Sequence, residues 1–264
     1  MNKNILLISA IAALTIGCDN STLYGNEDAI ANISIKTVSD ISESRATTSL
    51  PNSLTVAWSG TITNSYTFQT VTESNFRQQT LRPGDYEFVA YNYNDENKAT
   101  PVGSRGEAYY KSDVISKTIT TGVNELSMVA KVANAQIAIT FDNTLTSIVS
   151  NWQATLFVEG VETRKILYSA SETAPAWFPA NKKLIINISY TYGGEDKSYT
   201  ITLPNEINVD GVPTHFDGTL VAGSAYTFNI GSSVADGKLT VTVNSTLSDA
   251  NGFIPMDPTI DPEI

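Results

Sequence analysis

The chain of 264 residues contains one cysteine and one histidine, and it has 16 basic residues against 27 acidic ones. A single cysteine excludes a disulfide framework and a cysteine-based zinc site. The net charge of −11 repels phosphate backbones and no basic cluster offsets it, so we expect no binding to nucleic acid. These shortages point away from cysteine chemistry and from nucleic-acid recognition.

The sequence also has little that would support catalysis. A Ser-His-Asp triad would depend on His215, which lies in a predicted turn before a strand, and no serine has the flanking glycines of a nucleophile elbow. Residues 92–97 are rich in oxygen donors but lack the glycine and the alternating acids of a calcium loop. We therefore expect a non-enzymatic protein with no cofactor and no resident metal.

Long apolar runs are missing apart from one near the N-terminus. Residues 5–16 are almost wholly apolar, about as long as the hydrophobic part of a signal peptide and too short to span a bilayer. The run ends at Gly17-Cys18, which resembles a bacterial lipobox, although Thr15 stands where such boxes usually have leucine. The resemblance implies a lipoprotein signal peptide over residues 1–17 and acyl chains on Cys18 that hold the protein on the outer membrane, at the cell surface. A secretory signal with an incidental cysteine is the alternative.

Stretches of leucine, alanine and glutamate that favour helices are scarce, whereas tyrosine is abundant, at 12 residues. Apolar and polar residues alternate instead, most clearly from Leu184 to Tyr192, and about a dozen such segments predict an all-β sandwich fold. Gly193-Gly194 predicts a hairpin with a turn that continues through Glu195-Asp196. Only the spacing of Leu145, Ile148 and Val149 predicts one or two helical turns. The positions expected in the core include Leu126, Met128, Ile186, Ile188 and Val241.

An internal sequence repeat predicts two tandem domains. A leucine, a turn glycine and a Tyr-x-Phe strand occur at Leu81 to Phe88 and again at Leu220 to Phe228. Chance similarity between strands is the alternative to duplication. We predict a tether over residues 18–30, an N-terminal β-sandwich over 31–132, a C-terminal β-sandwich over 133–250, and a disordered acidic tail with three prolines over 251–264.

Three segments together with the lipobox resemble the fimbrillin-like lipoproteins of Bacteroidota. They begin at Leu81 (Leu-Arg-Pro-Gly-Asp-Tyr), at Ala133 (Ala-Asn-Ala-Gln-Ile-Ala-Ile-Thr-Phe) and at Val221 (Val-Ala-Gly-Ser-Ala-Tyr). A neighbouring family, known only as a domain of unknown function, shares the middle segment and matches equally well. The resemblance implies two transthyretin-like, Greek-key sandwiches on the outer membrane that act in pilus assembly, pilus anchoring or adhesion.

In pilin members of that family an arginine-directed protease removes the N-terminal strand, and the strand of another subunit takes its place. Arg45 is a candidate cleavage site here, because it follows the predicted strand through Ile33 and Ile35. We expect this strand to fill an edge of the first sandwich. The sequence allows removal of the strand, as in a pilin, and retention, as in an anchor or a free-standing adhesin.

A surface glycan-binding lipoprotein is the second interpretation, and a hydrolase with a carboxylate pair is the third and weakest. Residues 92–113 form a long polar insertion after the first Tyr-x-Phe strand. Aromatic rings that flank this insertion or stand between prolines could stack on sugar faces. The alternative is that these rings cover the edges of the core. The candidate residues are Tyr91, Tyr93, Tyr109, Tyr110, Trp177 and Phe178.

The lipid anchor leads to a direct test. Each buried methylene of an acyl chain contributes about 0.8 kcal/mol, and two chains hold a protein stably on a bilayer. We expect Cys18→Ala to abolish labelling with a fatty-acid probe and to release the protein from membranes. Continued labelling of this variant would contradict the lipoprotein interpretation.

Overall fold

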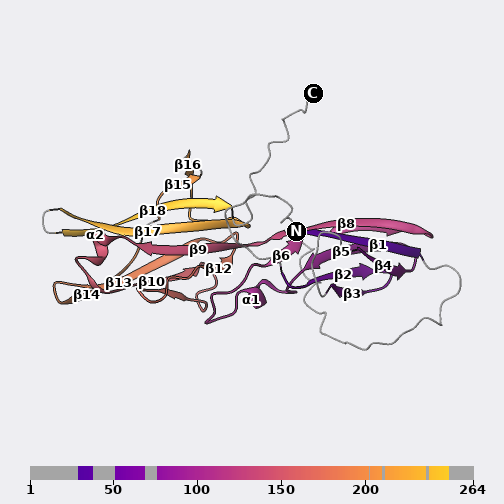
Figure 1. Cartoon of the computed structure of the whole chain (residues 1–264), viewed down its shortest axis with the longest axis horizontal. Coiled ribbons are helices and arrows are strands. Elements are labelled where there is room, and N and C mark those ends of the chain that lie inside the picture. Colours follow the sequence, from indigo (N-terminus) through magenta and orange to yellow (C-terminus); the bar gives the residue numbers. More distant parts are fainter. Residues whose placement is uncertain are drawn as a thin grey trace, which may run out of the picture.

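The computed structural model describes residues 29–37, 51–68, 76–201, 203–209, 212–235 and 238–249. This part of the chain forms 18 strands and two helices of four residues each, which confirms the all-β fold class. The molecule is elongated, with β1 to β8 at one end and β9 to β18 at the other (Figure 1). Residues 29 and 30, which the sequence assigned to the tether, belong to the first strand.

The N-terminal half is one curled, eight-stranded sheet. The strand order is β3-β2-β5-β6-β8-β1-β4, and β7 also pairs with β5. The curl brings β1 and β8 over β2 and β5 (Figure 1). The strands are β1 (Ala29–Thr37), β2 (Leu54–Gly60), β3 (Asn64–Phe68), β4 (Phe76–Leu81), β5 (Gly84–Tyr91), β6 (Tyr110–Ser112), β7 (Ile115–Ile119) and β8 (Val123–Val132). The helix α1 (Glu96–Ala99) lies in the connection between β5 and β6.

The C-terminal half is a sandwich of two sheets. A four-stranded sheet, β11-β10-β13-β14, faces a six-stranded sheet, β12-β9-β17-β18-β15-β16. Its elements are β9 (Asn134–Phe141), α2 (Asn143–Thr146), β10 (Ser150–Val158), β11 (Ile166–Tyr168), β12 (Ala176–Pro179), β13 (Leu184–Tyr192), β14 (Glu195–Thr200), β15 (Glu206–Val209), β16 (Val212–His215), β17 (Ser224–Ala235) and β18 (Lys238–Asp249). The predicted helical turn is α2, which buries Leu145.

Buried side chains gather into two clusters that follow this division. The first draws on β1 to β8 and includes Leu126 and Met128, and the second draws on β9 to β17 and includes Ile186 and Ile188. These four core positions are therefore confirmed, whereas the side chain of Val241 lies outside the described residues. The chain passes from one cluster to the other between Val132 and Asn134. The exact domain limits stay predictions.

The hairpin between β13 and β14 is tighter than the sequence predicted. Tyr192 pairs directly with Glu195, so Gly193 and Gly194 alone form the loop. Both glycines have positive φ, 62° and 83°, which the two central positions of a type I′ turn require. Glu195 and Asp196 accordingly belong to β14 and not to the turn.

In the structure, the tyrosines of the two repeated Tyr-x-Phe segments have the same role. The Tyr86 hydroxyl donates to the Arg82 carbonyl at 3.0 Å, and the Tyr226 hydroxyl accepts from the Val221 N–H at 2.9 Å. Each ring is buried and lies about 6 Å from the phenylalanine two positions on, at centroid distances of 5.9 and 6.2 Å. Both tyrosines thus tie the start of a core strand to the turn before it, as in the tyrosine corner of other sandwiches.

The segment between β5 and β6, residues 92–109, crosses from the first half to the second, and we call it the insert. Arg105 reaches from the insert across the junction and donates to the carbonyls of Ala174, Leu167 and Glu172 at 2.6, 2.9 and 3.2 Å. Its guanidinium also lies 4.4 Å from the centre of the Tyr168 ring, a cation–π contact. The sequence predicted a polar insertion here but not this role.

The junction itself is held by Asn134, the asparagine of the Ala-Asn-Ala segment, whose side chain is fully buried. Its Oδ1 accepts from the Tyr109 N–H at 2.9 Å, and its Nδ2 donates to the Glu107 carbonyl at 2.8 Å. The neighbouring Ala133 N–H donates to the Tyr109 carbonyl at 2.7 Å. The first residues of the second half are therefore bonded to the insert of the first.

The strand β12 joins the two cores from the other side. Successive residues of a strand point to opposite faces. Trp177 packs into the first cluster and Phe178 into the second. The Trp177 N–H donates to the Arg105 carbonyl at 2.7 Å, so β12 and the insert hold each other across the junction.

The packing of β13 can be measured by two substitutions. Ile188 is fully buried, so we expect Ile188→Ala to lower the free energy of unfolding by ~2–5 kcal/mol through lost burial and a new cavity. Ile185, three positions earlier, is only half-buried, and Ile185→Ala is the matched control with a clearly smaller loss. Urea denaturation measures both. A loss under ~0.5 kcal/mol for Ile188→Ala would contradict the assigned face.

The junction gives a second prediction. Asn134→Ala leaves the buried Tyr109 N–H without a partner, at a cost of ~1–3 kcal/mol, and removes a bond to the partly buried Glu107 carbonyl, so we expect a loss of stability of at least ~1 kcal/mol. Asn187 makes a similar side-chain bond, to Thr200, at the surface, and Asn187→Ala should change stability by less than ~0.5 kcal/mol. Equal losses in the two variants by thermal and urea denaturation would disprove the role of Asn134.

Candidate functional site

The first candidate site is the position of β1, which is not the sheet edge that the sequence suggested. β1 lies between two strands, parallel to β8 over eight residue pairs and antiparallel to β4 over six. The expectation of an edge strand is wrong, because local alternation shows that a segment is a strand but not which strands flank it. The parallel partner lies about ninety residues away in the sequence, out of reach of any local pattern.

The inner face of β1 carries two small side chains and one larger one. Ala29, Ala31 and Ile33 are at most 1% exposed and belong to the first core. The start of the strand is fixed by the Ile30 N–H, which donates to the Gly122 carbonyl at 3.0 Å. The amide of Asn124 also reaches the Ile30 carbonyl, at 3.4 Å. Removing β1 would therefore expose core side chains and leave unpaired backbone groups on both β8 and β4.

Two predicted site residues flank this strand but lie outside the described residues. Cys18 precedes β1 and Arg45 falls in the segment between β1 and β2. The placement of β1 bears on both predictions. A group attached to Cys18 is connected to the fold through this strand, and cleavage after Arg45 would separate the strand from the rest of the chain. Lipidation of Cys18 and cleavage after Arg45 stay predictions.

The aromatic residues predicted to stack on sugars are mostly inside the protein. Trp177 and Phe178 fill the two cores as described, and Tyr109 and Tyr110 are 6% and 3% exposed. The expectation that these four rings are open to solvent is wrong. Trp177 and Phe178 point from β12 into the two cores, and the insert folds back on the sheet beside Tyr109 and Tyr110. Tyr91 and Tyr93 are half-buried. The Tyr93 hydroxyl donates to Glu107 at 2.6 Å, and this bond is the main reason that its pKa is raised.

The polar residues of the insert serve its own fold. Asn92 accepts from the Tyr110 N–H at 2.8 Å and donates to the Ala108 carbonyl at 2.8 Å, which closes the base of the insert. Asp95 caps α1 by accepting from the Asn97 N–H at 3.0 Å. Within the described ranges, no three metal-ligating side chains gather in one place.

His215 lies in a strand and not in the predicted turn. It ends β16, an exposed strand at the border of the six-stranded sheet, and pairs with Glu206 of β15. Within the described part of the chain, neither helix is long and apolar enough to cross a bilayer.

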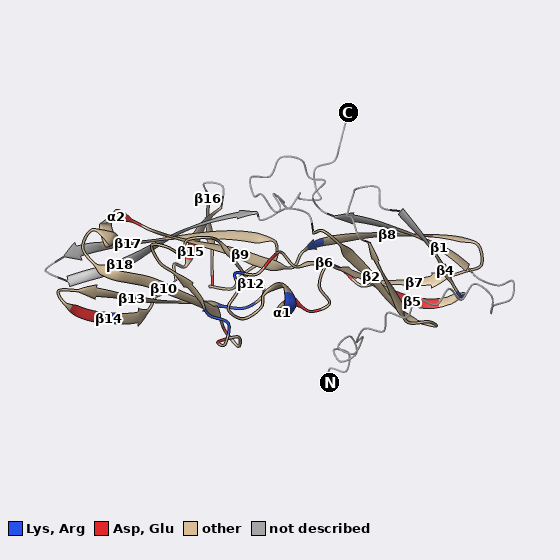
Figure 2. Cartoon of the chain, turned by 60° about the horizontal axis from the view of Figure 1, so that its bottom comes forward, with Lys and Arg blue, Asp and Glu red and all other residues tan. Residues whose placement is uncertain are grey.

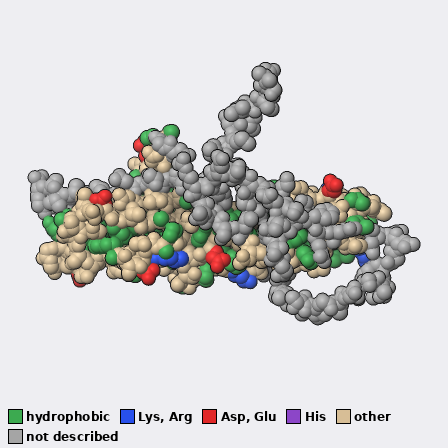
Figure 3. Space-filling model, viewed as in Figure 1, with side chains coloured by type: hydrophobic (Ala, Val, Ile, Leu, Met, Phe, Trp, Pro, Cys, Tyr) green, Lys and Arg blue, Asp and Glu red, His purple; other side chains and the backbone are tan. Residues whose placement is uncertain are grey.

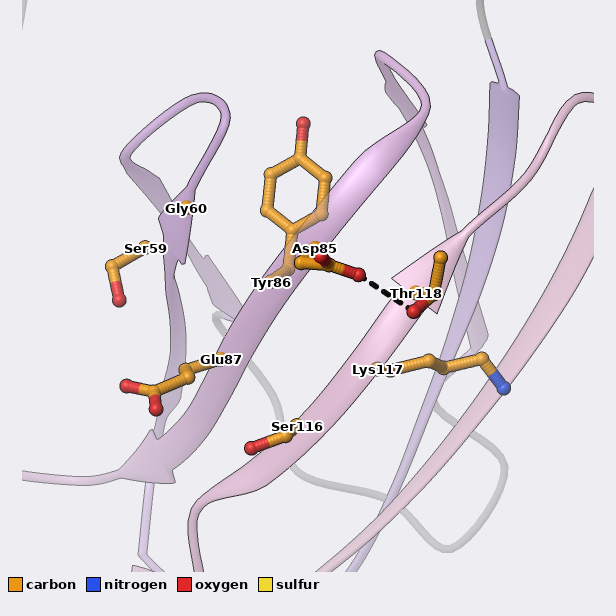
Figure 4. Close-up of a pocket in the computed structure, with 8 residues that line it drawn as sticks. All are labelled: Ser59, Gly60, Asp85, Tyr86, Glu87, Ser116, Lys117 and Thr118. Carbon is orange, nitrogen blue, oxygen red and sulfur yellow. Dashed lines mark hydrogen bonds between the residues drawn. The ribbon is translucent and has the colours of Figure 1, made fainter.

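The second candidate site is an open groove of about 400 Å³ on the outer face of the N-terminal sheet (Figure 4). Three adjacent strands supply its side chains: Ser59 from β2, Glu87 from β5 and Ser116 from β7 stand opposite one another. The strands β2 and β5 approach closely at the end of the groove. A Cβ atom added to Gly60 would lie only 2.1 Å from the Asp85 carbonyl oxygen. Only glycine fits there.

The groove is acidic. Asp85 accepts from the Thr118 hydroxyl at 2.6 Å, and Glu87 is exposed beside it. Lys117 also borders the groove, but its side chain points away from both carboxylates, and its ammonium donates to the Glu125 carbonyl (Figure 4). Acidic residues of β5 accordingly stand out at this end of the molecule in Figure 2. On the face seen in Figure 3, hydrophobic side chains form small, separate patches.

The fold resembles that of fimbrial proteins of known structure. A fimbrilin from Porphyromonas gingivalis superposes with a TM-score of 0.56 at 11% identity, covering 85% of this chain and 98% of the fimbrilin. The fimbrial anchor protein Mfa2 of the same species gives a TM-score of 0.46 at 9% identity, over 82% of this chain and 97% of Mfa2. The tip fimbrial protein Mfa3, also from this species, gives 0.41 at 12% identity, over 84% and 99%. At these identities the likeness concerns the fold alone.

The sequence itself matches one family over most of its length. No protein with a curated description matches the chain. A family model described as a domain of unknown function, DUF4493, matches residues 30–256, from the start of β1 to beyond the end of β18. The predicted resemblance to a fimbrillin-like family of unknown function is thereby confirmed, and the chain belongs to the DUF4493 family.

Proposed function

We propose that this protein is a lipid-anchored, non-enzymatic surface protein of the outer membrane that acts as an adhesin or a fimbrial component. The observation that carries the proposal is the position of β1 between β8 and the edge strand β4 of the N-terminal sheet, directly after the predicted anchor and before Arg45. The fimbrial fold of the solved structures supports it. The proposal includes two tandem, transthyretin-like domains with the limits predicted from the sequence.

The place of β1 defines what a substitute strand must provide. Such a strand would have to run parallel to β8 and antiparallel to β4, where it would complete both by β-augmentation. Its inner face must offer small side chains at the positions of Ala29 and Ala31, since both are fully buried, and a larger apolar one at Ile33. A partner subunit would thus be recognised by a strand with apolar residues at every second position, two small ones followed by one branched one.

The same geometry favours retention of β1 in this protein. A strand at an edge can leave at the cost of one set of backbone pairs, whereas β1 has partners on both sides and three buried side chains. An anchor or adhesin keeps this strand, and the lipid on Cys18 then stays connected to the folded sheet. A pilin-like subunit would lose it and accept a partner's strand.

The mature N-terminus on cells distinguishes the two roles. We expect mass spectrometry of the protein from outer membranes to find lipidated Cys18 still joined to β1, and Arg45→Ala to leave the mass otherwise unchanged and the surface display intact. Arg82→Lys, at an exposed position in the turn before β5, is a control for arginine-directed cleavage elsewhere. A mature chain that begins at Ala46, together with loss of polymers in Arg45→Ala, would overturn retention in favour of the trimmed-pilin role.

A further inference from the structure

Arg164 is the only charged side chain among the buried residues that the structure describes. It lies in the connection between β10 and β11 and is 3% exposed. Within the described part of the chain, its Nε, Nη1 and Nη2 have no hydrogen-bond partner. A guanidinium carries five N–H donors, and burying a charge without acceptors for them is costly. The protein therefore keeps an unfavourable group in its interior.

The guanidinium of Arg164 lies between the second core and the insert. Its Cζ is 5.2 Å from the centre of the Phe178 ring. A Cβ atom added to Gly106 of the insert would lie 3.0 Å from Nη2 of Arg164 and 2.8 Å from the Ala99 carbonyl oxygen. The backbone of residues 99–106 thus closes directly over the charge.

The surrounding groups compensate this charge only in part. Burial lowers the pKa of Arg164 to about 10, although Glu96 and Tyr168 act in the opposite direction. The Phe178 ring attracts the cation through its face but does not replace the hydrogen bonds that water would supply. The guanidinium is therefore less well solvated under the insert than it would be in water.

A second arginine holds the same part of the insert closed. The Arg105 side chain donates to three backbone carbonyls of the second half, and its own carbonyl accepts from the Trp177 N–H at 2.7 Å. Arg105 makes these bonds only while the insert lies on the second half. Arg164, in contrast, gains bonds to water only when the insert lifts. The two arginines therefore act on the insert in opposite directions.

The base of the insert is fixed independently of both arginines. Asn92 closes one end of it, and Asn134 is bonded to residues 107 and 109 at the other. The stretch between them, residues 96–106, contains no strand and only the single turn α1, which lies between the two halves of the molecule (Figures 1 and 2). We call residues 96–106 the cover, because they can lift from Arg164 while the base stays in place.

We propose that the cover opens and closes over Arg164 in the folded protein, with the buried guanidinium favouring the open state and Arg105 favouring the closed one. Opening breaks the contact that Arg105 makes across the junction but leaves the bonds of Asn134 intact, so it loosens the junction without unfolding either core. The inference concerns the junction and not β1, and it therefore goes beyond the proposed function.

Hydrogen exchange of the purified full-length chain, followed by mass spectrometry of short overlapping peptides, measures the opening. The N–H groups of Glu107 and Trp177 report it, since they donate to the cover carbonyls of Ala99 and Arg105, both at 2.7 Å. Peptides from β13 report global unfolding. We expect the two reporter amides to exchange at least about tenfold faster than the slowest amides of β13.

Two substitutions should shift the opening in opposite directions. We expect Arg164→Met to slow exchange of the reporter amides about tenfold or more, because Met fills the space and contacts the Phe178 ring without a charge to solvate. Arg105→Met should speed this exchange about tenfold or more, because three bonds to the second half are lost. Lys165→Met is the matched control, since it removes an exposed charge one residue away and should change the exchange less than twofold.

Circular dichroism melting of the same variants separates opening of the cover from a change in the whole fold. The melting temperature of Arg164→Met should equal or exceed that of the unmodified chain. Three results would each overturn the inference: reporter amides that exchange as slowly as β13, an Arg164→Met variant whose reporters exchange as fast as before or faster, or an Arg164→Met variant that fails to fold. None of these measurements depends on the mature N-terminus, so the fimbrial proposal is tested separately.

Discussion

Buried hydrogen bonds between the insert and Asn134 are the interaction on which the shape of the molecule depends. The chain crosses from the first core to the second in a single residue, Ala133, which alone would leave the two halves free to rotate. The side chain of Asn134 and the backbone around it are instead bonded to residues 107 and 109. Because Asn134 and the Tyr109 N–H are buried, water cannot replace the bond between them, and the junction is strong for its size.

Two side chains cross the junction in opposite directions. Arg105 leaves the first half and bonds to carbonyls of the second, while Trp177 leaves the second half and packs in the first core. Either contact alone would allow a hinge about the other. Together with Asn134 they hold the halves at three places.

The alternation of side chains predicted most of the strands and the core, because each face of a strand has its own environment. It identified Ile186 and Ile188 as buried and the Tyr-x-Phe strands as related. It could not identify the neighbours of a strand, so β1 was assigned to an edge although β8 pairs with it from far along the sequence. It also could not show that the polar insert folds back, because residues such as Asn92 and Arg105 have the same composition whether they bond to water or to the protein. For that reason the prediction that Tyr109 is exposed was wrong.

The two candidate sites use different parts of one sheet. Exchange of β1 concerns its pairs with β8 and β4, whereas the groove is built on β2, β5 and β7. Both parts share the first core, since Ala29 and Ile33 pack in the same cluster as Phe88 behind the groove. Retention of β1 would therefore support the groove indirectly: a sheet that loses this strand loses part of the packing behind the strand that presents Glu87 and Val89. An adhesin that binds a ligand on this face has a physical reason to keep its first strand.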